Sequence, residues 1–290
     1  MNLLMNNIDI KESILRRTGD LLDILLIDRT TKKNIIWATD SYERHGEEFS
    51  PKKRIKPELV TGIYGKLIQP RAVKSLAEQR RRTKDKAEVF TKLKTVDQIN
   101  ETVENRPPNK NNWQEYVREL KLEITCGEAP FIVSRYNPTL HTRTLIKLDN
   151  RVGFLDKKLK VVSKYCHKKN EWLFWAKEAF KASYGYEWQG DNVLLARENL
   201  LYTLIDYYKA KFKRSPSLSV QEKFAEIISW NIFQMDGLKY VVPMSCHHEN
   251  KAIPDVLPLF EKIPGKVERR YVKIMDWSKN KAVRFLDLTI

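Results

Sequence analysis

The chain has 290 residues, of which 42% are hydrophobic and 10% aromatic, so it can bury a sizeable core and does not have a disordered composition. Its charge of 53 − 37 = +16 attracts polyanions, and double-stranded DNA is the foremost expected partner. No stretch approaches the ~20 apolar residues of a membrane span. The polar N-terminus and the three cysteines predict a cytoplasmic protein without a membrane partner.

The first 110 residues are expected to form an N-terminal segment that joins a β-hairpin to a basic helix. Residues 20–40 hold two apolar runs around a polar turn, which predicts the hairpin. Residues 43–57 and the glycine-bearing stretch after them are predicted to be loop or bent strand. Residues 71–90 are predicted to be helical, with a basic cluster that is either a solvated face or a DNA-phosphate contact. The cluster comprises Arg80, Arg81, Arg82, Lys84 and Lys86.

A polar, proline-bearing break at residues 101–113 precedes an α/β domain predicted over residues 111–290. Its predicted elements are a strand over 117–125, helices over 172–183 and 192–212, a helix over 220–234 that ends like a strand, and strands over 271–275 and 282–288. Helices that alternate with short apolar strands are typical of an α/β layer structure.

Candidate ligand-binding residues stand at three places where apolar segments end. Glu123 and Gly127 flank the first end, where glycine lets the backbone approach a ligand closely. Glu187 follows a short strand, from which a carboxylate can accept hydrogen bonds from both hydroxyls of a ribose. Asp236 could accept the amino group of an adenine. Simpler interpretations are a plain strand-to-loop turn, a helix-start acid and an Asp-Gly turn.

Taken together and in this order, the three places resemble the γ-type N6-adenine DNA methyltransferases of restriction-modification systems. The glycine motif of that family is D/E-P-x-C-G-x-G-x-F. This chain matches its acid, Cys, Gly and Phe with Glu123, Cys126, Gly127 and Phe131. Ala129 replaces the second glycine.

The second motif of the family, Y-G-x-E/D-x-x-P-x-A-x-x-L-A-R-x-N-L, is the most specific match. The residues in register with it are Tyr184, Gly185, Glu187, Leu195, Ala196, Arg197, Asn199 and Leu200. The family's G-D-x-L element is similar to residues 235–238, and its F-T-P element to Phe90-Thr91. The resemblance implies S-adenosylmethionine (SAM) as cofactor, with Glu187 on its ribose, Asp236 on its adenine, and Phe90 and Thr91 on its methionine part.

Nearly the whole chain is similar to proteins labelled restriction endonuclease subunit M. That similarity implies a Rossmann-like SAM-dependent methyltransferase sheet with an N-terminal basic extension, and a restriction or specificity subunit as a partner. The family's catalytic N/D-P-P-Y/F motif has no counterpart here. The nearest analogue is Asp276-Trp277, where the acid could accept the target amino group and the indole could stack on a flipped base. The alternative is a strand end with a buried Trp.

Two other functions stay open. A non-catalytic DNA- or partner-binding module with a vestigial SAM pocket is favoured by the missing motif. A restriction nuclease would need acids and a lysine around a divalent metal, and the hairpin offers only a generic set: Asp20, Asp23, Asp28, Asp40, Lys32 and Lys33. Cys166-His167 and Cys246-His247-His248 are more typical of a buried thiol and a polar loop than of a zinc site, so no metal is expected.

Overall fold

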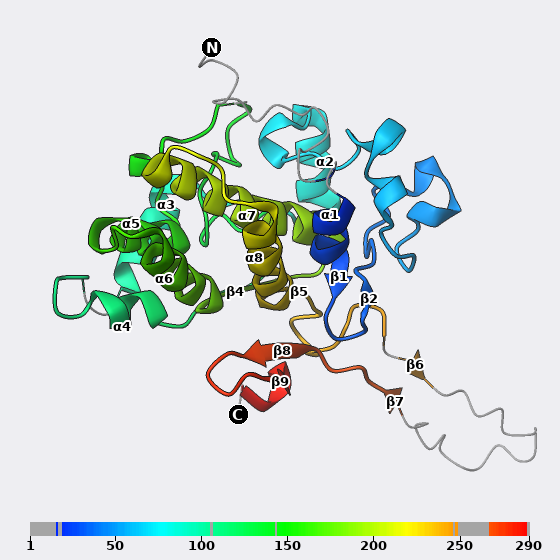
Figure 1. The fold of residues 1–290 in the computed structure, drawn as a ribbon. Coiled ribbons are helices and arrows are strands. Elements are labelled where there is room, and N and C mark those ends of the chain that lie inside the picture. Colours follow the sequence, from blue (N-terminus) through cyan, green and yellow to red (C-terminus); the bar gives the residue numbers. More distant parts are fainter. Residues whose placement is uncertain are drawn as a thin grey trace, which may run out of the picture.

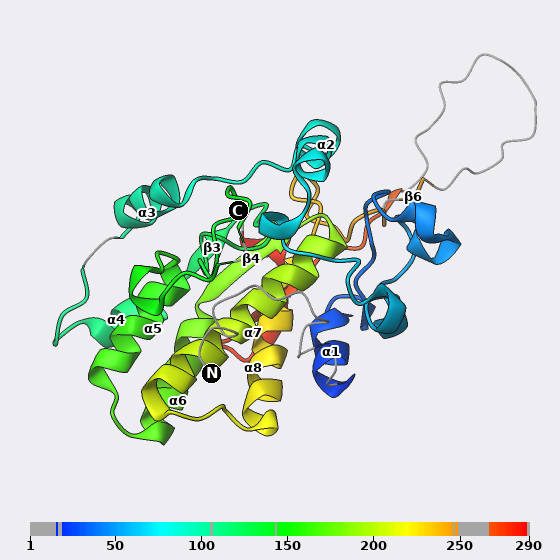
Figure 2. The same ribbon diagram turned by 90° about the horizontal axis from the view of Figure 1, so that it is seen from above.

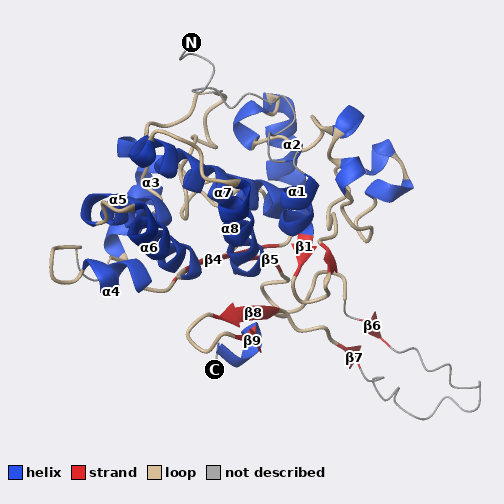
Figure 3. Cartoon of the chain, in the orientation of Figure 1, coloured by secondary structure: helices blue, strands red, loops and turns tan. Residues whose placement is uncertain are grey.

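The computed structural model describes residues 16, 19–104, 107–142, 144–245, 247–248 and 267–288. These residues form a mixed α/β structure with one three-stranded parallel sheet (Figures 1 and 3). The helices are α1 (Gly19–Leu26), α2 (Leu76–Lys86), α3 (Leu93–Thr102), α4 (Trp113–Arg118), α5 (Phe154–Tyr165), α6 (Lys169–Lys181), α7 (Gly190–Phe212) and α8 (Leu218–Asn231). The strands are β1 (Ile27–Asp28), β2 (Lys33–Asn34), β3 (Lys121–Glu123), β4 (Ser183–Glu187), β5 (Ile232–Gln234), β6 (His247–His248), β7 (Val267–Glu268), β8 (Lys273–Asp276) and β9 (Lys281–Arg284).

The parallel sheet has the strand order β3-β4-β5, with Lys121 opposite Ser183 and Gly185 opposite Ile232. Parallel neighbours require long crossover connections. Helices α5 and α6 provide the first crossover, and α7 and α8 provide the second. These helices lie together on one side of the sheet (Figure 1). All three carboxyl ends therefore meet at one edge, as expected for a site built on strand ends.

The opposite side of the sheet is covered by the antiparallel β8–β9 hairpin (Figure 1). Tyr186 and Phe233 project from β4 and β5 into a small apolar cluster with Ile274 and Phe285. The sequence predicted strands over 271–275 and 282–288. The second prediction is only partly right, because the chain turns into a 3-10 helix at Phe285–Leu288.

The predicted hairpin over residues 20–40 is wrong in its first half, which is helix α1. Its leucines are buried on a helical face that packs against α7 and α8, and they are Leu21, Leu22, Leu25 and Leu26. Arg197 from α7 donates to the carbonyls of Leu25 (2.5 Å) and Ile27 (2.9 Å), which closes the end of this helix. A hairpin remains only at β1 and β2.

Other predicted bounds shift. Val117 and Arg118 end α4 rather than begin a strand, so β3 is short. The helices predicted at 172–183 and 192–212 and the helix-to-strand change within 220–234 are confirmed as α6, α7, α8 and β5. Buried side chains of the first 60 residues share one core with those of α5 to α8. No helix in the described part of the chain is long and apolar enough to cross a membrane.

Candidate functional site

A cavity of about 640 Å³ lies at the carboxyl ends of β3 and β4. Pockets of this size hold small organic ligands. Most of its wall comes from four segments, residues 38–40, 86–91, 123–127 and 187–189, and single residues such as Phe131 and Asn192 complete it. The structure brings six of the seven residues expected to bind a cofactor to this cavity: Phe90, Thr91, Glu123, Cys126, Gly127 and Glu187.

Glu187 ends β4 and is buried, with a relative exposure of 7%. One carboxylate oxygen accepts a hydrogen bond from the backbone N–H of Gly127 (2.9 Å), and the other accepts one from the N–H of Gln189 (3.0 Å). Burial raises the pKa of Glu187 despite these donors. Each oxygen has a second lone pair, so the fixed carboxylate can still accept two hydrogen bonds from a ligand.

Gly127 lies in the left-handed region at φ 54°, and a Cβ there would approach the ring of Phe90 to 3.0 Å. Glycine is therefore needed for both the turn and the close approach. The Phe90 ring is covered on another side by the guanidinium of Arg71, 5.1 Å from the ring centroid. This contact joins the segment before α2 to the segment after it.

Glu123 and Cys126 shape the floor of the cavity. The Glu123 carboxylate accepts the N–H groups of Phe131 (3.2 Å) and Ile132 (3.0 Å), which folds the loop back onto β3. Burial, and then the nearby charge of Glu187, raise its pKa well above the usual range. Burial also raises the pKa of the Cys126 thiol, so this cysteine is a packed neutral group and not a nucleophile.

The N-terminal segment forms one wall because it crosses the start of α7. The N–H of Gly190 donates to the carbonyl of Trp37 (2.9 Å), and a Cβ on Gly190 would lie 2.0 Å from the carbonyl oxygen of Ile36. The indole N–H of Trp188 donates to the carbonyl of Ala38 (2.9 Å). The ring of Trp188 thus lines the cavity as an aromatic wall while it holds this segment in place.

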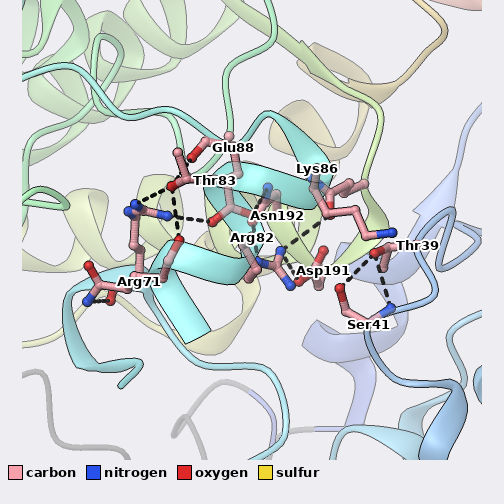
Figure 4. Close-up of polar contacts among 12 residues, drawn as sticks. Thr39, Ser41, Arg71, Arg82, Thr83, Lys86, Glu88, Asp191 and Asn192 are labelled. Atoms are coloured by element: carbon pink, nitrogen blue, oxygen red, sulfur yellow. Dashed lines mark hydrogen bonds and ion pairs between the residues drawn. The ribbon is translucent and has the colours of Figure 1, made fainter. Parts of the chain in front are cut away.

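Arg82 was expected on a DNA-binding face, but its side chain is 1% exposed. Figure 4 shows this side chain among Glu88, Asp191 and Asn192. Its guanidinium bonds Glu88 (Nε to Oε2, 2.7 Å) and Asp191 (Nη2 to Oδ2, 2.7 Å). The hydroxyl of Tyr42 donates to the same Asp191 oxygen (2.7 Å). Burial opposes ionisation of Asp191, but Arg82 lowers its pKa overall. The prediction for Arg82 is therefore wrong, because the residue ties the cavity wall after α2 to the start of α7.

The other basic residues of α2 lie differently. Arg80, Arg81 and Lys84 are exposed. Lys86 forms an ion pair with Asp40, and both residues line the cavity (Figure 4 labels Lys86). The exposed basic residues of α2 therefore lie on the same helix as Lys86, which lines the cavity.

Asp236 follows β5 but is not among the residues that line the cavity. Its Oδ1 accepts the N–H groups of Leu238 (3.0 Å) and Lys239 (3.1 Å), the geometry of a local turn. The structure therefore places this residue in the Asp-Gly turn that was its simpler interpretation.

Asp276 and Trp277 lie at the end of β8, which belongs to the separate antiparallel hairpin. Oδ1 of Asp276 accepts the hydroxyl (2.6 Å) and the N–H (3.0 Å) of Ser278 within the β8–β9 turn. The indole of Trp277 donates to Oδ1 of Asn231 (2.8 Å) and packs against the main core. Neither residue lines the cavity. Both were expected to take part in methyl transfer, but their side chains make structural contacts instead.

Several cavity residues were missed from the sequence. Trp188 and Gln189 could have been found, since they directly follow Glu187 at the strand end. Thr39, Asp40 and Asn192 carry no local signal, because only tertiary packing brings them there. No cluster of three His, Cys, Asp or Glu side chains that could hold a metal occurs in the part of the chain that the structure describes; Cys246 lies outside it.

No protein-family model matches the chain, and no curated protein or solved structure matches it either. The functional argument therefore depends on the residues of the cavity and on the sequence motifs that predicted them.

Proposed function

We propose that the chain is a SAM-binding protein of the N6-adenine DNA methyltransferase type, built on a Rossmann-like sheet. One observation carries the proposal. Residues from three separate motifs of the family, Phe90-Thr91, Cys126-Gly127 and Glu187, line a single cavity at the carboxyl edge of a parallel sheet. Packing alone does not require three motifs spread over almost 100 residues to converge on one hollow.

The cavity suits a nucleoside cofactor in shape and chemistry. Glu187 offers a fixed carboxylate with spare acceptor capacity to the ribose diol, and Gly127 lets the backbone approach the ligand. Trp188 and Phe131 provide apolar surface for a flat base. When bound, SAM supplies a sulfonium methyl group for transfer to an amino nitrogen. The chain's own role would be to hold and orient it.

The basic face of α2 would hold DNA phosphates through Arg80, Arg81 and Lys84, next to the cavity mouth. A base extruded from the duplex would then face the cofactor. Together with Lys86 at the cavity, these three residues are the chain's expected DNA contacts, and a restriction or specificity subunit is an expected partner.

A second candidate is a non-catalytic DNA- or partner-binding module that keeps the pocket. It is favoured by the positions of Asp276 and Trp277, which are engaged in the β8–β9 turn and the core instead of lining the cavity. Transfer of a labelled methyl group from SAM to plasmid DNA separates the two candidates. Transfer would identify an enzyme, while SAM binding without transfer would identify the module.

Isothermal titration calorimetry with SAM tests the proposal itself. We expect saturable binding that is competed by S-adenosylhomocysteine. Absence of heat at millimolar SAM would refute both candidates, because both keep the pocket. Mg²⁺-dependent cleavage of the plasmid without SAM binding would point to the nuclease alternative instead.

A further inference from the structure

The parallel sheet has one bare edge. Strand β3 pairs only with β4, and no other described strand lies beside it. The backbone N–H of Lys121 points towards β4 and donates to the carbonyl of Ala182 (3.1 Å). Because the direction of the backbone N–H and C=O groups alternates along a strand, the groups of the next residue point away from the sheet. An edge strand of this kind offers unpaired N–H and C=O groups to another chain.

The opposite edge of the sheet is covered. The side chain of Gln234 on β5 exchanges two hydrogen bonds with the backbone of Ile36, one from the N–H of Ile36 (3.0 Å) and one to its carbonyl (2.8 Å). Beyond the end of β5, Asp236 pairs with Val241. Among the described residues, segments of the chain therefore cover one edge of the sheet and leave the β3 edge open.

The bare edge is also apolar. Leu120, Leu122 and Ile124, in β3 and directly on either side of it, are 73%, 43% and 63% exposed. The charged residues between them are engaged elsewhere: Glu123 accepts backbone N–H groups, and Lys121 lies over the ring of Tyr116. Exposed apolar side chains beside a free strand edge mark an interaction site.

A groove of about 440 Å³ runs along this edge. Its other wall is the end of α3, where Ile99 and Val103 are 43% and 51% exposed. Phe131 and Phe154 contribute to its lining. Figure 2 shows α3 apart from the main helical layer, on the β3 side of the sheet. The groove can receive the alternate side chains of a strand paired to β3.

We propose that the free edge of β3 and this groove bind an extended, apolar segment of a neutral or acidic partner polypeptide, by addition of a fourth strand. Backbone hydrogen bonds would give affinity and the groove would select alternate apolar side chains. The net charge of +16 opposes the approach of a second copy of this chain, so the expected occupant is a different polypeptide that is not itself basic. This proposal does not depend on which ligand the cavity binds.

A defined probe tests this site. The probe is a fluorescent synthetic peptide of alternating valine and threonine with glutamates at both ends, and its control carries proline at alternate positions, which removes the N–H donors. Fluorescence anisotropy with the full chain should show saturable binding of the first peptide and none of the second. Hydrogen exchange of the amides of residues 120–124 should slow when the first peptide is bound.

Two matched variants locate the contact. Leu122→Asp lies on the edge, and Leu218→Asp lies at the start of α8 with nearly equal exposure, 43% against 44%. We expect Leu122→Asp to weaken peptide binding by about tenfold or more and Leu218→Asp to leave it unchanged. Both changes alter the net charge equally, and thermal unfolding checks that both variants fold.

The proposal fails if neither peptide binds at millimolar concentration, if the proline peptide binds as well, or if both variants lose affinity equally. Unprotected amides at residues 120–124 in the wild-type complex would contradict it even if Leu122→Asp were unfolded. Sedimentation of the chain alone tests whether a second copy of the chain occupies the edge. A dimer that Leu122→Asp dissociates would overturn the choice of a foreign partner.

Discussion

Replacement of Glu187 by glutamine is expected to weaken SAM binding about ten- to hundredfold. The carboxylate lines the cavity, and each of its oxygens is held by one backbone N–H, from Gly127 and from Gln189. Ribose hydroxyls that donate to an ionised group contribute roughly 1.5–3 kcal/mol, which corresponds to this loss when one such bond is removed.

The same change also affects folding, since glutamine has one acceptor oxygen for two N–H donors. Its amide NH₂ would face either Gly127 or Gln189 and leave a buried donor unpaired, at a cost of roughly 1–3 kcal/mol. Affinity must therefore be measured by calorimetry on protein whose folded fraction is known from thermal unfolding.

Glu128→Gln is the matched control. Glu128 is also buried and accepts two hydrogen bonds, from the N–H of Arg71 and the hydroxyl of Tyr136 (2.6 Å each), but it does not line the cavity. We expect the control to lose stability while it keeps SAM affinity. Equal SAM affinity in Glu187→Gln and the wild type would refute the assignment of the ribose to this carboxylate.

The pH dependence gives a second readout. Burial raises the pKa of Glu187, and ribose hydroxyls bind the ionised form. Affinity should therefore be complete above this raised pKa and fall as the pH drops through it, at a higher pH than for an ordinary glutamate. The Glu187→Gln protein should lack this decline.

Three further predictions concern stability and DNA binding. Burial lowers the pKa of Lys158 to about 7, so between pH 7 and 10 the unfolded chain holds a proton that the folded chain has lost. In denaturant titrations, the stability of the wild type relative to Lys158→Met should therefore rise over this range, by at most about 1.4 kcal/mol per pH unit. A stability difference that stays constant with pH would contradict the lowered pKa. Arg82→Met leaves the buried Asp191 without an ion-pair partner and Glu88 with Arg71 alone, and should cost about 3–5 kcal/mol of unfolding free energy, whereas exposed Arg81→Met should stay within about 0.5 kcal/mol. Joint replacement of Arg80, Arg81 and Lys84 by Gln should reduce the slope of log K for DNA against log salt by about 0.9 for each phosphate that the variant no longer neutralises; an unchanged slope would place the DNA elsewhere.

The sequence predicted α6, α7, α8 and the end of β4 well, because these depend on local periodicity, but it did not predict α5. Helix α7 carries apolar residues over more than six turns, and two residues separate its start from the acid that ends β4. Parallel strands must send their carboxyl ends to one edge. The convergence of Gly127 and Glu187 could therefore be expected from the sequence alone.

The role of Arg82 could not be expected in this way. It is one of three consecutive arginines, and only its position on α2 turns it towards Glu88 and Asp191 while its neighbours stay exposed. Similarly, the leucines of residues 21–26 fit a strand or a helix over so short a run. Contact with α8 decides in favour of the helix.

Asp276 shows that a motif at a strand end can form a site only if its strand belongs to the sheet that carries the site. The acid and the following Trp277 have the expected order, but β8 pairs with β9 in an antiparallel hairpin, so its end does not reach the edge where β3 and β4 end. The cofactor half of the resemblance, apart from Asp236, thus converges on one cavity, and the catalytic half does not.

The cavity and the bare strand edge share a wall. Glu123, Ile124 and Phe131 line both the cavity and the groove. A strand added parallel to β3 would end beside the cavity and bring residues from outside this chain to its mouth. Because the two sites are in contact, occupation of one should change affinity at the other by the same factor in both directions. A catalytic group that this chain does not place at the cavity would then have a physical route to it, through a partner bound at β3.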